Sequence, residues 1–525
     1  MTSSPSSRLA GENPTLFRWL VAIAVMTSAV MELVDTSAVN VSIPYIAGNL
    51  SATIDEATWV LTSYLVSNAV VLPLTGWLAS RFGRKRLLVT AIAGFTVSSM
   101  LCGAAPSLPI LIFCRVLQGA FGGTLQPTTR AILLETFPRE ERGKAMAMWG
   151  VGIVVAPIMA PVLGGWLTTD YSWRWVFFIN LPVSIVGLIL VHLYVFDPPY
   201  LRRTTKGIDY WGLGMLVTGI AALQIVLDKG QEADWFSSRF ILVLAVIAVA
   251  GLTSFVIWEL VTQDPMVHLR LLKYRTFGTC VGLSVVLFFV LYGSILLLPL
   301  FMQEVLNFPA ITAGFWNCPR GIATMALMPV AGFLIGRRWD MRAMLFGGIL
   351  VSAAGMLSFS FLDLTSGPWN FLWPQIIMGA GLGFVFVPFA TISVDPIPNE
   401  EMGYATSITG LTRNLGAGFG ISISATLLDR RDQVHQMRLA ARVSSTNPLT
   451  ANLLSALQAY FHRGGADLST AGHQALGALY SVVQVQASVL SYLDAFRFLA
   501  AMFLLVSPVV WIMRKPHFKS EGGEK

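Results

Sequence analysis

The chain has 525 residues, of which 55% are hydrophobic and only 12% are charged, and its mean hydropathy is +0.67. Soluble domains carry about 25% charged residues, so this composition excludes an ordinary soluble protein. Apolar runs of about 20 residues, the length that a helix needs to cross the hydrocarbon of a bilayer, recur from end to end. We therefore predict an all-α polytopic membrane protein.

The apolar runs predict about fourteen spans. The first run follows a polar N-terminus and lacks a small-residue cleavage site, so we expect a retained span rather than a signal peptide. In chain order the predicted spans cover residues 16–38, 57–79, 87–105, 108–134, 145–168, 174–196, 209–228, 239–260, 276–300, 312–335, 343–362, 370–394, 403–427 and 495–513.

Lysine and arginine gather in the loops on one side of these spans. The segments that hold them are RFGRKR (81–86), REERGK (139–144), LRRTTK (201–206), HLRLLKYR (268–275), GRRWDMR (336–342) and RKPHFK (514–519). The short loops 39–56, 301–311 and 363–369 on the other side hold neither residue. By the positive-inside rule, both termini are predicted to be cytoplasmic. The rule also explains the net charge of +7 without a nucleic-acid partner.

A coarse internal repeat divides the chain. The turn GWLASRFGRKR (76–86) is similar to GFLIGRRWDMR (332–342), which follows the corresponding span of a second half. The predicted units are a cytoplasmic tail (1–15), an N-terminal six-helix bundle (16–196), a linker with two inserted spans (197–275), a C-terminal six-helix bundle (276–513) and a second tail (514–525). Transporters built from repeats place substrate between the halves, near the midplane.

The segment 428–494 lies within the C-terminal unit, on the side opposite the basic loops. Its mixed polarity predicts amphipathic helices that project from the membrane rather than further spans. Because it is too long for an ordinary connection, we expect it to contact another molecule.

Polar residues recur along one face of the first predicted span. They are Ser28, Glu32, Asp35, Thr36 and Asn40, at spacings that place them on one stripe of a helix. A charge at the membrane centre costs about 2.5–3.5 kcal/mol on insertion scales. Such groups therefore face partners or a water-filled cavity.

The fourth predicted span carries a matching basic stripe, formed by Arg115, Gln118, Gly122, Gln126 and Arg130. Two stripes of opposite charge in one half predict an aqueous path between them, and a structural ion pair is the alternative. Burial raises the pKa of a carboxyl and a nearby arginine lowers it, so such an acid suits a proton-coupled cycle. We predict Asp35 as the main proton carrier, Arg115 as its modulating partner, and Glu32 as a second proton site or a contact for cationic substrates.

The fifth predicted span reads WGVGIVVAPIMAPVLGGW (149–166). Pro157 and Pro161 interrupt its backbone hydrogen bonds, while Gly164 and Gly165 allow close packing, so we expect a kinked helix that takes part in gating. Two further intramembrane charges, Arg320 and Arg413, are explained equally well as substrate contacts or as structural clamps. The predicted substrate cavity comprises Glu32, Asn40, Gln118, Gln126, Arg130, Arg320 and Arg413.

These segments resemble, in order, the signatures of the fourteen-span drug:proton antiporters of the major facilitator superfamily, the EmrB/QacA subfamily, and of its EmrB-type members most of all. They are LVDTSAVNVSIP, with Asp35; GWLASRFGRKR, with Gly76, Arg81, Gly83, Arg84 and Lys85; RVLQGAFGG, with Arg115 and Gln118; APIMAPVLGG; WRWVFFINLP (173–182); and LDKGQEADWFSS (227–238). The chain departs from the pattern at Ser80, which replaces the usual acid of the loop signature, and at Ala160, which replaces a glycine. Glu32 and Arg320 are additions to it.

The resemblance implies two six-helix bundles with two inserted helices, and proton-coupled export of hydrophobic or amphipathic toxic compounds from the bacterial inner membrane. EmrB-type members work with a periplasmic membrane-fusion adaptor of the EmrA/HlyD type and a TolC-type outer-membrane channel, so the segment 428–494 is the expected adaptor contact. The resemblance also implies gating roles for the loop signature and for the proline-rich fifth span.

Three other functions were weighed. Nothing in the sequence excludes export of a native metabolite, such as a fatty acid or a siderophore, in place of drugs. A membrane-embedded enzyme is disfavoured because no nucleophile–histidine–acid set, metal-ligand spacing or phosphate-binding glycine loop is present, and we expect neither a cofactor nor a metal. A sensor would need a soluble signalling domain, for which both predicted cytoplasmic ends are too short.

Overall fold

The computed structural model describes residues 13–197, 209–263, 265–443 and 447–515. In these ranges the regular structure consists of helices only. The N-terminal half contains α2 (Pro14–Asn49), α3 (Ile54–Ala57), α4 (Trp59–Val71), η1 (Leu72–Leu74), α5 (Thr75–Phe82), α6 (Arg84–Ala104), α7 (Leu108–Gly122), α8 (Leu125–Thr136), α9 (Arg142–Asp170), α10 (Trp175–Phe178) and α11 (Asn180–Tyr194).

Two inserted helices and the second half follow. The inserted helices are α12 (Tyr210–Lys229) and α13 (Arg239–Val261), joined through η2 (Trp235–Ser237). The second half contains η3 (Leu269–Lys273), α14 (Arg275–Leu300), the π-helix η4 (Phe301–Val305), α15 (Ala310–Gly336), α16 (Met341–Ser358), η5 (Phe359–Phe361), η6 (Pro368–Phe371), α17 (Leu372–Ile392), η7 (Asn399–Glu401), α18 (Met402–Ala440), α19 (Pro448–Arg463), α20 (Leu468–Val506) and η8 (Ser507–Ile512).

Thirteen helices of the described chain are long and apolar enough to cross a membrane. Helix α18 is not among them, because polar residues interrupt its apolar surface, yet it packs lengthwise against the membrane helices α14 and α20. With α18 the described chain reaches the fourteen spans that the sequence predicts. A helix whose polar residues face protein rather than lipid escapes a hydropathy criterion.

Two predicted spans are broken rather than continuous. The span 57–79 divides into α4, η1 and α5 at Pro73, and the span 108–134 divides into α7 and α8 at Gly123 and Thr124. A Cβ atom at Gly123 would lie 2.6 Å from the carbonyl oxygen of Asn68, so only glycine permits this approach to α4. The prediction that the basic stripe lies on one helix is therefore wrong: Gln118 belongs to α7 and Gln126 to α8.

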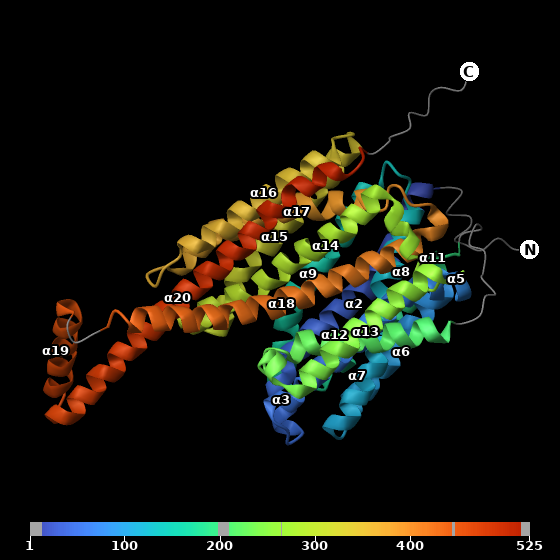
Figure 1. Ribbon diagram of the computed structural model, residues 1–525. Coiled ribbons are helices and arrows are strands. Elements are labelled where there is room, and N and C mark those ends of the chain that lie inside the picture. Colours follow the sequence, from blue (N-terminus) through green and yellow to red (C-terminus); the bar gives the residue numbers. More distant parts are fainter. Residues whose placement is uncertain (1–12, 198–208, 264, 444–446, 516–525) are drawn as a thin grey trace, which may run out of the picture.

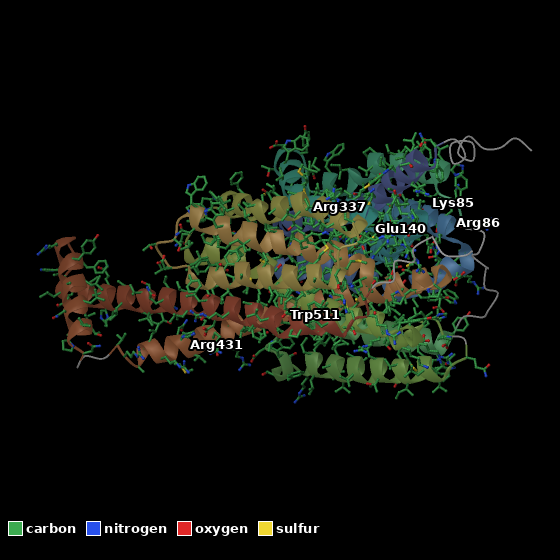
Figure 2. The ribbon with its side chains drawn as sticks, turned by 90° about the horizontal axis from the view of Figure 1, so that it is seen from above. Lys85, Arg86, Glu140, Arg337, Arg431 and Trp511 are labelled. Carbon is green, nitrogen blue, oxygen red and sulfur yellow. The ribbon has the colours of Figure 1, made fainter. Side chains whose placement is uncertain are left out.

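The described loops rich in lysine and arginine, 81–86, 139–144, 268–275 and 336–342, lie together at one end of the bundle, which we call the basic end. The predicted basic segment 201–206 and residues 516–519 of the segment 514–519 lie outside the described residues. There Arg18 pairs with Glu141 at 3.2 Å, and Arg342 donates to the carbonyl oxygen of Met513 at 3.3 Å, which joins chain segments far apart in sequence. Figure 2 shows Lys85, Arg86 and Glu140 near this end and Arg431 far toward the other. From the basic end the two halves diverge, with α2, α6 and α7 running one way and α14 to α17 the other (Figure 1).

Packing between the halves is concentrated toward the basic end. A Cβ atom at Gly76 would lie 2.7 Å from the Cα atom of Tyr404, and one at Gly332 would lie 2.9 Å from the carbonyl oxygen of Gly143. Arg142 also donates to the amide oxygen of Asn399 at 3.1 Å. The two halves are thus closed against each other at the basic end, and they diverge toward the far end.

Helices α18 and α20 extend beyond the rest of the bundle at the far end and carry α19 at their tip (Figures 1 and 2). They hold each other through His435 and Asp494 at 2.9 Å and through Asp432 and Ser488 at 3.1 Å. In its described residues, the predicted segment 428–494 therefore consists of extensions of the two membrane helices α18 and α20 together with the helix α19.

Candidate functional site

A fully buried ion pair between α2 and α7 forms the first part of the candidate site. The Nη1 atom of Arg115 donates to Asp35 Oδ2 at 2.8 Å, and both side chains have no exposed surface. Gln118 Nε2 and Asn180 Nδ2 donate to Asp35 Oδ1 at 3.0 and 2.6 Å. The carboxylate thus accepts hydrogen bonds from three side chains, two on α7 and one on α11, an arrangement that suits an ionised acid.

The Arg115 guanidinium is held through its Nε and Nη1 atoms, whereas its buried Nη2 atom has no hydrogen-bond partner among the described residues. Its Nε atom donates to the carbonyl oxygen of Val60 at 3.1 Å, and Nη1 also donates to Gln118 Oε1 at 2.7 Å. The ring of Tyr64 lies 4.2 Å from its central carbon. Both members of the pair are therefore fixed in place, and neither lines open water in this conformation, unlike the predicted aqueous path.

Glu32, three residues before Asp35, has a separate set of partners. Its Oε1 atom accepts hydrogen bonds from Tyr64 Oη at 3.2 Å and Asn68 Nδ2 at 3.1 Å. Its Oε2 atom accepts one from Gln126 Nε2 at 2.5 Å. Glu32 is 5% exposed and has no lysine or arginine within ion-pair distance among the described residues. Glu32 and Asp35 thus belong to two distinct polar clusters. Tyr64 contacts both, because it donates to Glu32 and its ring lies against Arg115.

Gln126 connects the Glu32 cluster to the other half of the molecule. Its Oε1 atom accepts a hydrogen bond from Nη2 of Arg413 on α18. The Arg413 guanidinium also lies 5.9 Å from the ring of Phe288 and 6.0 Å from that of Trp149. One amide side chain therefore bridges a buried carboxylate of the N-terminal half and an arginine of the C-terminal half.

Arg130, one turn further along α8, joins the halves directly. It donates to Thr409 Oγ1 at 3.0 Å, to the carbonyl oxygen of Ala390 at 3.1 Å and to Ser393 Oγ at 3.1 Å. The three acceptors belong to α17, to its C-terminal end and to α18. Because one planar guanidinium binds all three, Arg130 acts as a clamp between the halves.

A cavity lies between the halves beside these two arginines. Its lining is aromatic and cationic and contains no carboxylate: Gln126, Pro127, Arg130, Trp149, Phe288, Phe386, Phe389, Ala390, Thr406, Thr409, Gly410 and Arg413. Of the predicted cavity residues, it brings together Gln126, Arg130 and Arg413. Gln118 instead belongs to the Asp35 cluster, and Glu32 lies behind Gln126.

Two predicted cavity residues lie elsewhere. Asn40 is exposed on α2, and Arg320 donates to Ser294 Oγ at 3.0 Å within the C-terminal half. Pro157 and Pro161 lie inside the unbroken helix α9, and a Cβ atom at Gly164 would lie 2.9 Å from the backbone of Ala38, whereas Gly165 faces open space. No cluster of histidine, cysteine and acidic residues in the described chain could hold a metal ion.

The sequence analysis missed three residues of the polar clusters, Tyr64, Asn68 and Asn180. Each is a polar side chain inside an apolar run, which is the signal that singled out Glu32 and Asp35. Asn180 also falls within the segment WRWVFFINLP, which carried part of the resemblance. A search for every intramembrane hydrogen-bonding residue, charged or not, would have found all three.

Comparison with known proteins agrees with this arrangement. The family model described as the Major Facilitator Superfamily matches residues 25–421, which include both polar clusters, the cavity and most of both halves. The chain belongs to the Major Facilitator Superfamily. This major facilitator chain is 36% identical over 511 residues to the multidrug export protein EmrB of Escherichia coli strain K12, covering 96% of each chain.

A second relative and one solved structure extend the comparison. The chain is 36% identical over 517 residues to the fatty acid resistance protein FarB of Neisseria gonorrhoeae, covering 96% of this chain and 97% of FarB. It matches the structure of the human organic anion transporter MFSD10 with a TM-score of 0.59 at 14% identity, covering 94% of this chain and 99% of that one. The match to the MFSD10 structure, at this low identity, supports the major facilitator fold alone.

The loop signature of this major facilitator chain lies at the basic end. Gly83 has φ +87°, a conformation that favours glycine, and the backbone N–H of Lys85 donates to Asp197 Oδ1 at 2.9 Å. Arg84 is buried and pairs with Glu135, and Arg81 lies over the ring of Trp77. The predicted gating residues of this loop therefore hold the N-terminal half together at its border with the C-terminal half.

Ser80, which stands where the family signature has an acid, has a partner across the border. Its Oγ atom lies 3.0 Å from Tyr404 Oη, and the Tyr404 ring stacks on His268 at 3.8 Å. The charged contact expected from the family pattern is thus replaced by a hydrogen bond between two hydroxyl groups. A neutral hydrogen bond contributes about 0.5–1.5 kcal/mol, less than a hydrogen bond to a charged group.

Proposed function

We propose that this chain is a drug:proton antiporter that exports hydrophobic and amphipathic compounds. The similarity to EmrB over 96% of both chains carries this proposal. The geometry supports it, because the N-terminal half buries two carboxylates and one of them, Glu32, hydrogen-bonds Gln126, which lines a cavity that the two halves share. Family and relatives indicate a transporter rather than an enzyme.

The buried acids supply the proton side of the exchange. In the observed conformation the basic end is closed, so protons would reach Asp35 and Glu32 from the far end. Protonation of Asp35 would weaken its pairing with Arg115 and free the α2–α7 contact for rearrangement. One proton moving down 100 mV releases about 2.3 kcal/mol, enough for roughly 40-fold accumulation of a neutral substrate.

The cavity lining favours one substrate class within this function. Arg130 and Arg413 place two guanidinium groups among four aromatic rings, and no acid is present on the lining. A lipophilic anion would meet both its charge and its apolar surface there. Export of a native lipophilic carboxylate is therefore the second candidate, and FarB, a fatty acid resistance protein, is a relative of equal identity.

The experiment for this function is transport in proteoliposomes. With an imposed proton gradient, purified protein should drive accumulation of substrates from a panel of lipophilic anions, neutral dyes and lipophilic cations, with protons moving in the opposite direction. The cavity predicts that lipophilic anions compete most strongly. Accumulation that survives collapse of the gradient by a protonophore would contradict the antiport proposal.

We further propose that the protein lies in a bacterial inner membrane with the basic end and both termini in the cytoplasm. The distribution of lysine and arginine supports this orientation. The far end, with its projecting helices α18, α19 and α20, would then face the periplasm. There a membrane-fusion adaptor of the EmrA/HlyD type, linked to a TolC-type channel, would bind.

Helix α19 offers the adaptor an exposed apolar stripe. Leu449, Leu453, Ala456 and Tyr460 follow each other at spacings of 4, 3 and 4, and Leu449 and Tyr460 are 79% and 70% exposed. Large exposed apolar side chains in such a row are typical of a helix-docking surface.

Replacing Leu449, Leu453 and Tyr460 together by serine should reduce capture of a purified EmrA-type adaptor at least tenfold. The reason is that the stripe loses its apolar area while the helices below it stay paired. Serine in place of the exposed Ala451 and Ala459, which lie on α19 outside the stripe, is the matched control and should leave capture unchanged. Undiminished capture by the triple variant would place the adaptor contact elsewhere.

A further inference from the structure

Gln126 connects a buried titratable acid of the N-terminal half to the opposite half through its side-chain amide. Its two amide atoms have opposite hydrogen-bonding roles: Nε2 donates to Glu32 Oε2 at 2.5 Å, and Oε1 accepts from Arg413 Nη2. An amide can meet both partners only while the first is an acceptor and the second a donor. The observed orientation therefore requires that Glu32 Oε2 carries no proton.

The hydrogen-bond partners of Glu32 decide where a proton would go. Oε1 already receives two donors, from Tyr64 and Asn68, whereas Oε2 receives only the one from Gln126. A proton on Oε2 would point toward the Gln126 N–H, and because both groups are donors, no hydrogen bond could form between them. Rotating the amide by half a turn restores that hydrogen bond, because Gln126 Oε1 then accepts from the protonated acid.

The same rotation breaks the contact between the halves. It turns Gln126 Nε2, a donor, toward the Arg413 guanidinium, which has donors only. No carboxylate of the described chain lies within ion-pair distance of Arg413 to replace the lost acceptor. We propose that Gln126 is a two-position relay that makes protonation of Glu32 and the Gln126–Arg413 contact mutually exclusive.

This relay rests on the proposed proton-coupled function and gives Glu32 a task distinct from that of Asp35. A proton arriving from the far end loosens one contact that holds the halves together beside the cavity, so it favours opening at the basic end. The titratable and charged groups around Glu32 are Asp35 on its own helix, Tyr64 on α4, Arg115 on α7, Tyr292 on α14 and Arg413 on α18. Gln126 alone bonds both Glu32 and Arg413.

The test uses a cysteine placed at Thr406, a buried cavity residue near the basic end, in a protein whose four native cysteines are replaced. The full chain is held in nanodiscs without substrate, and its labelling by a membrane-impermeant maleimide is followed at acidic and alkaline pH, after correction for the reactivity of a free thiol. With Gln126 present, labelling should be at least tenfold faster at acidic pH.

Three variants separate the relay from a structural role. Glu32→Gln and Gln126→Met should label fast at both pH values, and the double variant should label no faster than either. Gln126→Glu gives Arg413 a carboxylate partner, which the guanidinium keeps ionised, so it should label slowly at both pH values. Gln375→Met, which removes a buried amide that hydrogen-bonds neither Glu32 nor Arg413, is the control and should keep the pH response.

The relay would be overturned if Gln126→Met kept the full pH response of the labelling rate. It would also be overturned if Gln126→Met and Gln126→Glu changed the labelling rate in the same direction. The proposed function fails separately. If wild-type proteoliposomes exchange no protons for any substrate, antiport is wrong whatever the labelling shows. If they do exchange protons while the Gln126 variants label as the wild type does, only the relay is wrong.

Discussion

Replacing Arg115 by methionine is expected to destabilise the protein by about 3–5 kcal/mol, the cost of leaving one member of a buried ion pair without its partner. Asp35 has no exposed surface, and after the change only the amides of Gln118 and Asn180 would donate to it. The measurement is the midpoint of thermal unfolding in detergent, with transport assayed in parallel.

The double variant Asp35→Asn with Arg115→Met tests the reason for that loss. Removing both charges takes away the unpaired buried carboxylate, so most of the stability should return, while proton-coupled transport should not. A single variant as stable as the wild type would contradict the burial argument. A stable double variant that still couples would make the pair a structural clamp, the alternative that the sequence left open.

Replacing Arg130 by methionine is expected to shift the protein toward a conformation open at the basic end and to lower transport at least tenfold. Three hydrogen bonds between the halves disappear together, to Thr409, Ala390 and Ser393. Hydrogen bonds to a charged group contribute about 1.5–3 kcal/mol each, and a loss of even one such bond changes a two-state equilibrium by roughly 10- to 150-fold.

The measurement is the same labelling of a cysteine at Thr406, here at a single neutral pH. Arg130→Lys is the matched control, because it keeps the charge but loses the planar fork, and it should give an intermediate labelling rate. If Arg130→Met labels as slowly as the wild type, the closed basic end does not depend on this clamp.

The fold was predicted well from the sequence because membrane helices are recognisable by the length and hydropathy of their apolar runs. Helix α18 shows the limit of that signal, since its polar residues face other helices and its apolar content is too low to mark a span. The breaks at Pro73 and Gly123 were missed because an apolar run continues through both. Tertiary packing decides such breaks: Gly123 ends α7 where its backbone meets Asn68.

The candidate site was predicted in part. Glu32, Asp35 and Arg115 stood out because a charge in an apolar run needs a reason. Periodicity could place these residues on their own helices but could not say which side chains meet across helices. For that reason Asn180 was missed as a partner of Asp35, and Gln118 and Gln126 were grouped although they serve different acids. The role of Arg413 likewise depends on a contact between residues far apart in sequence.

The most direct test of the account is substrate-induced proton movement in proteoliposomes, with wild type compared with Asp35→Asn. Asp170→Asn, which changes an exposed acid at the end of α9, is the matched control. The account predicts that wild type and control exchange protons for substrate, whereas Asp35→Asn still binds substrate but moves no protons with it. Wild-type coupling in Asp35→Asn would contradict the central claim that this buried carboxylate carries the proton.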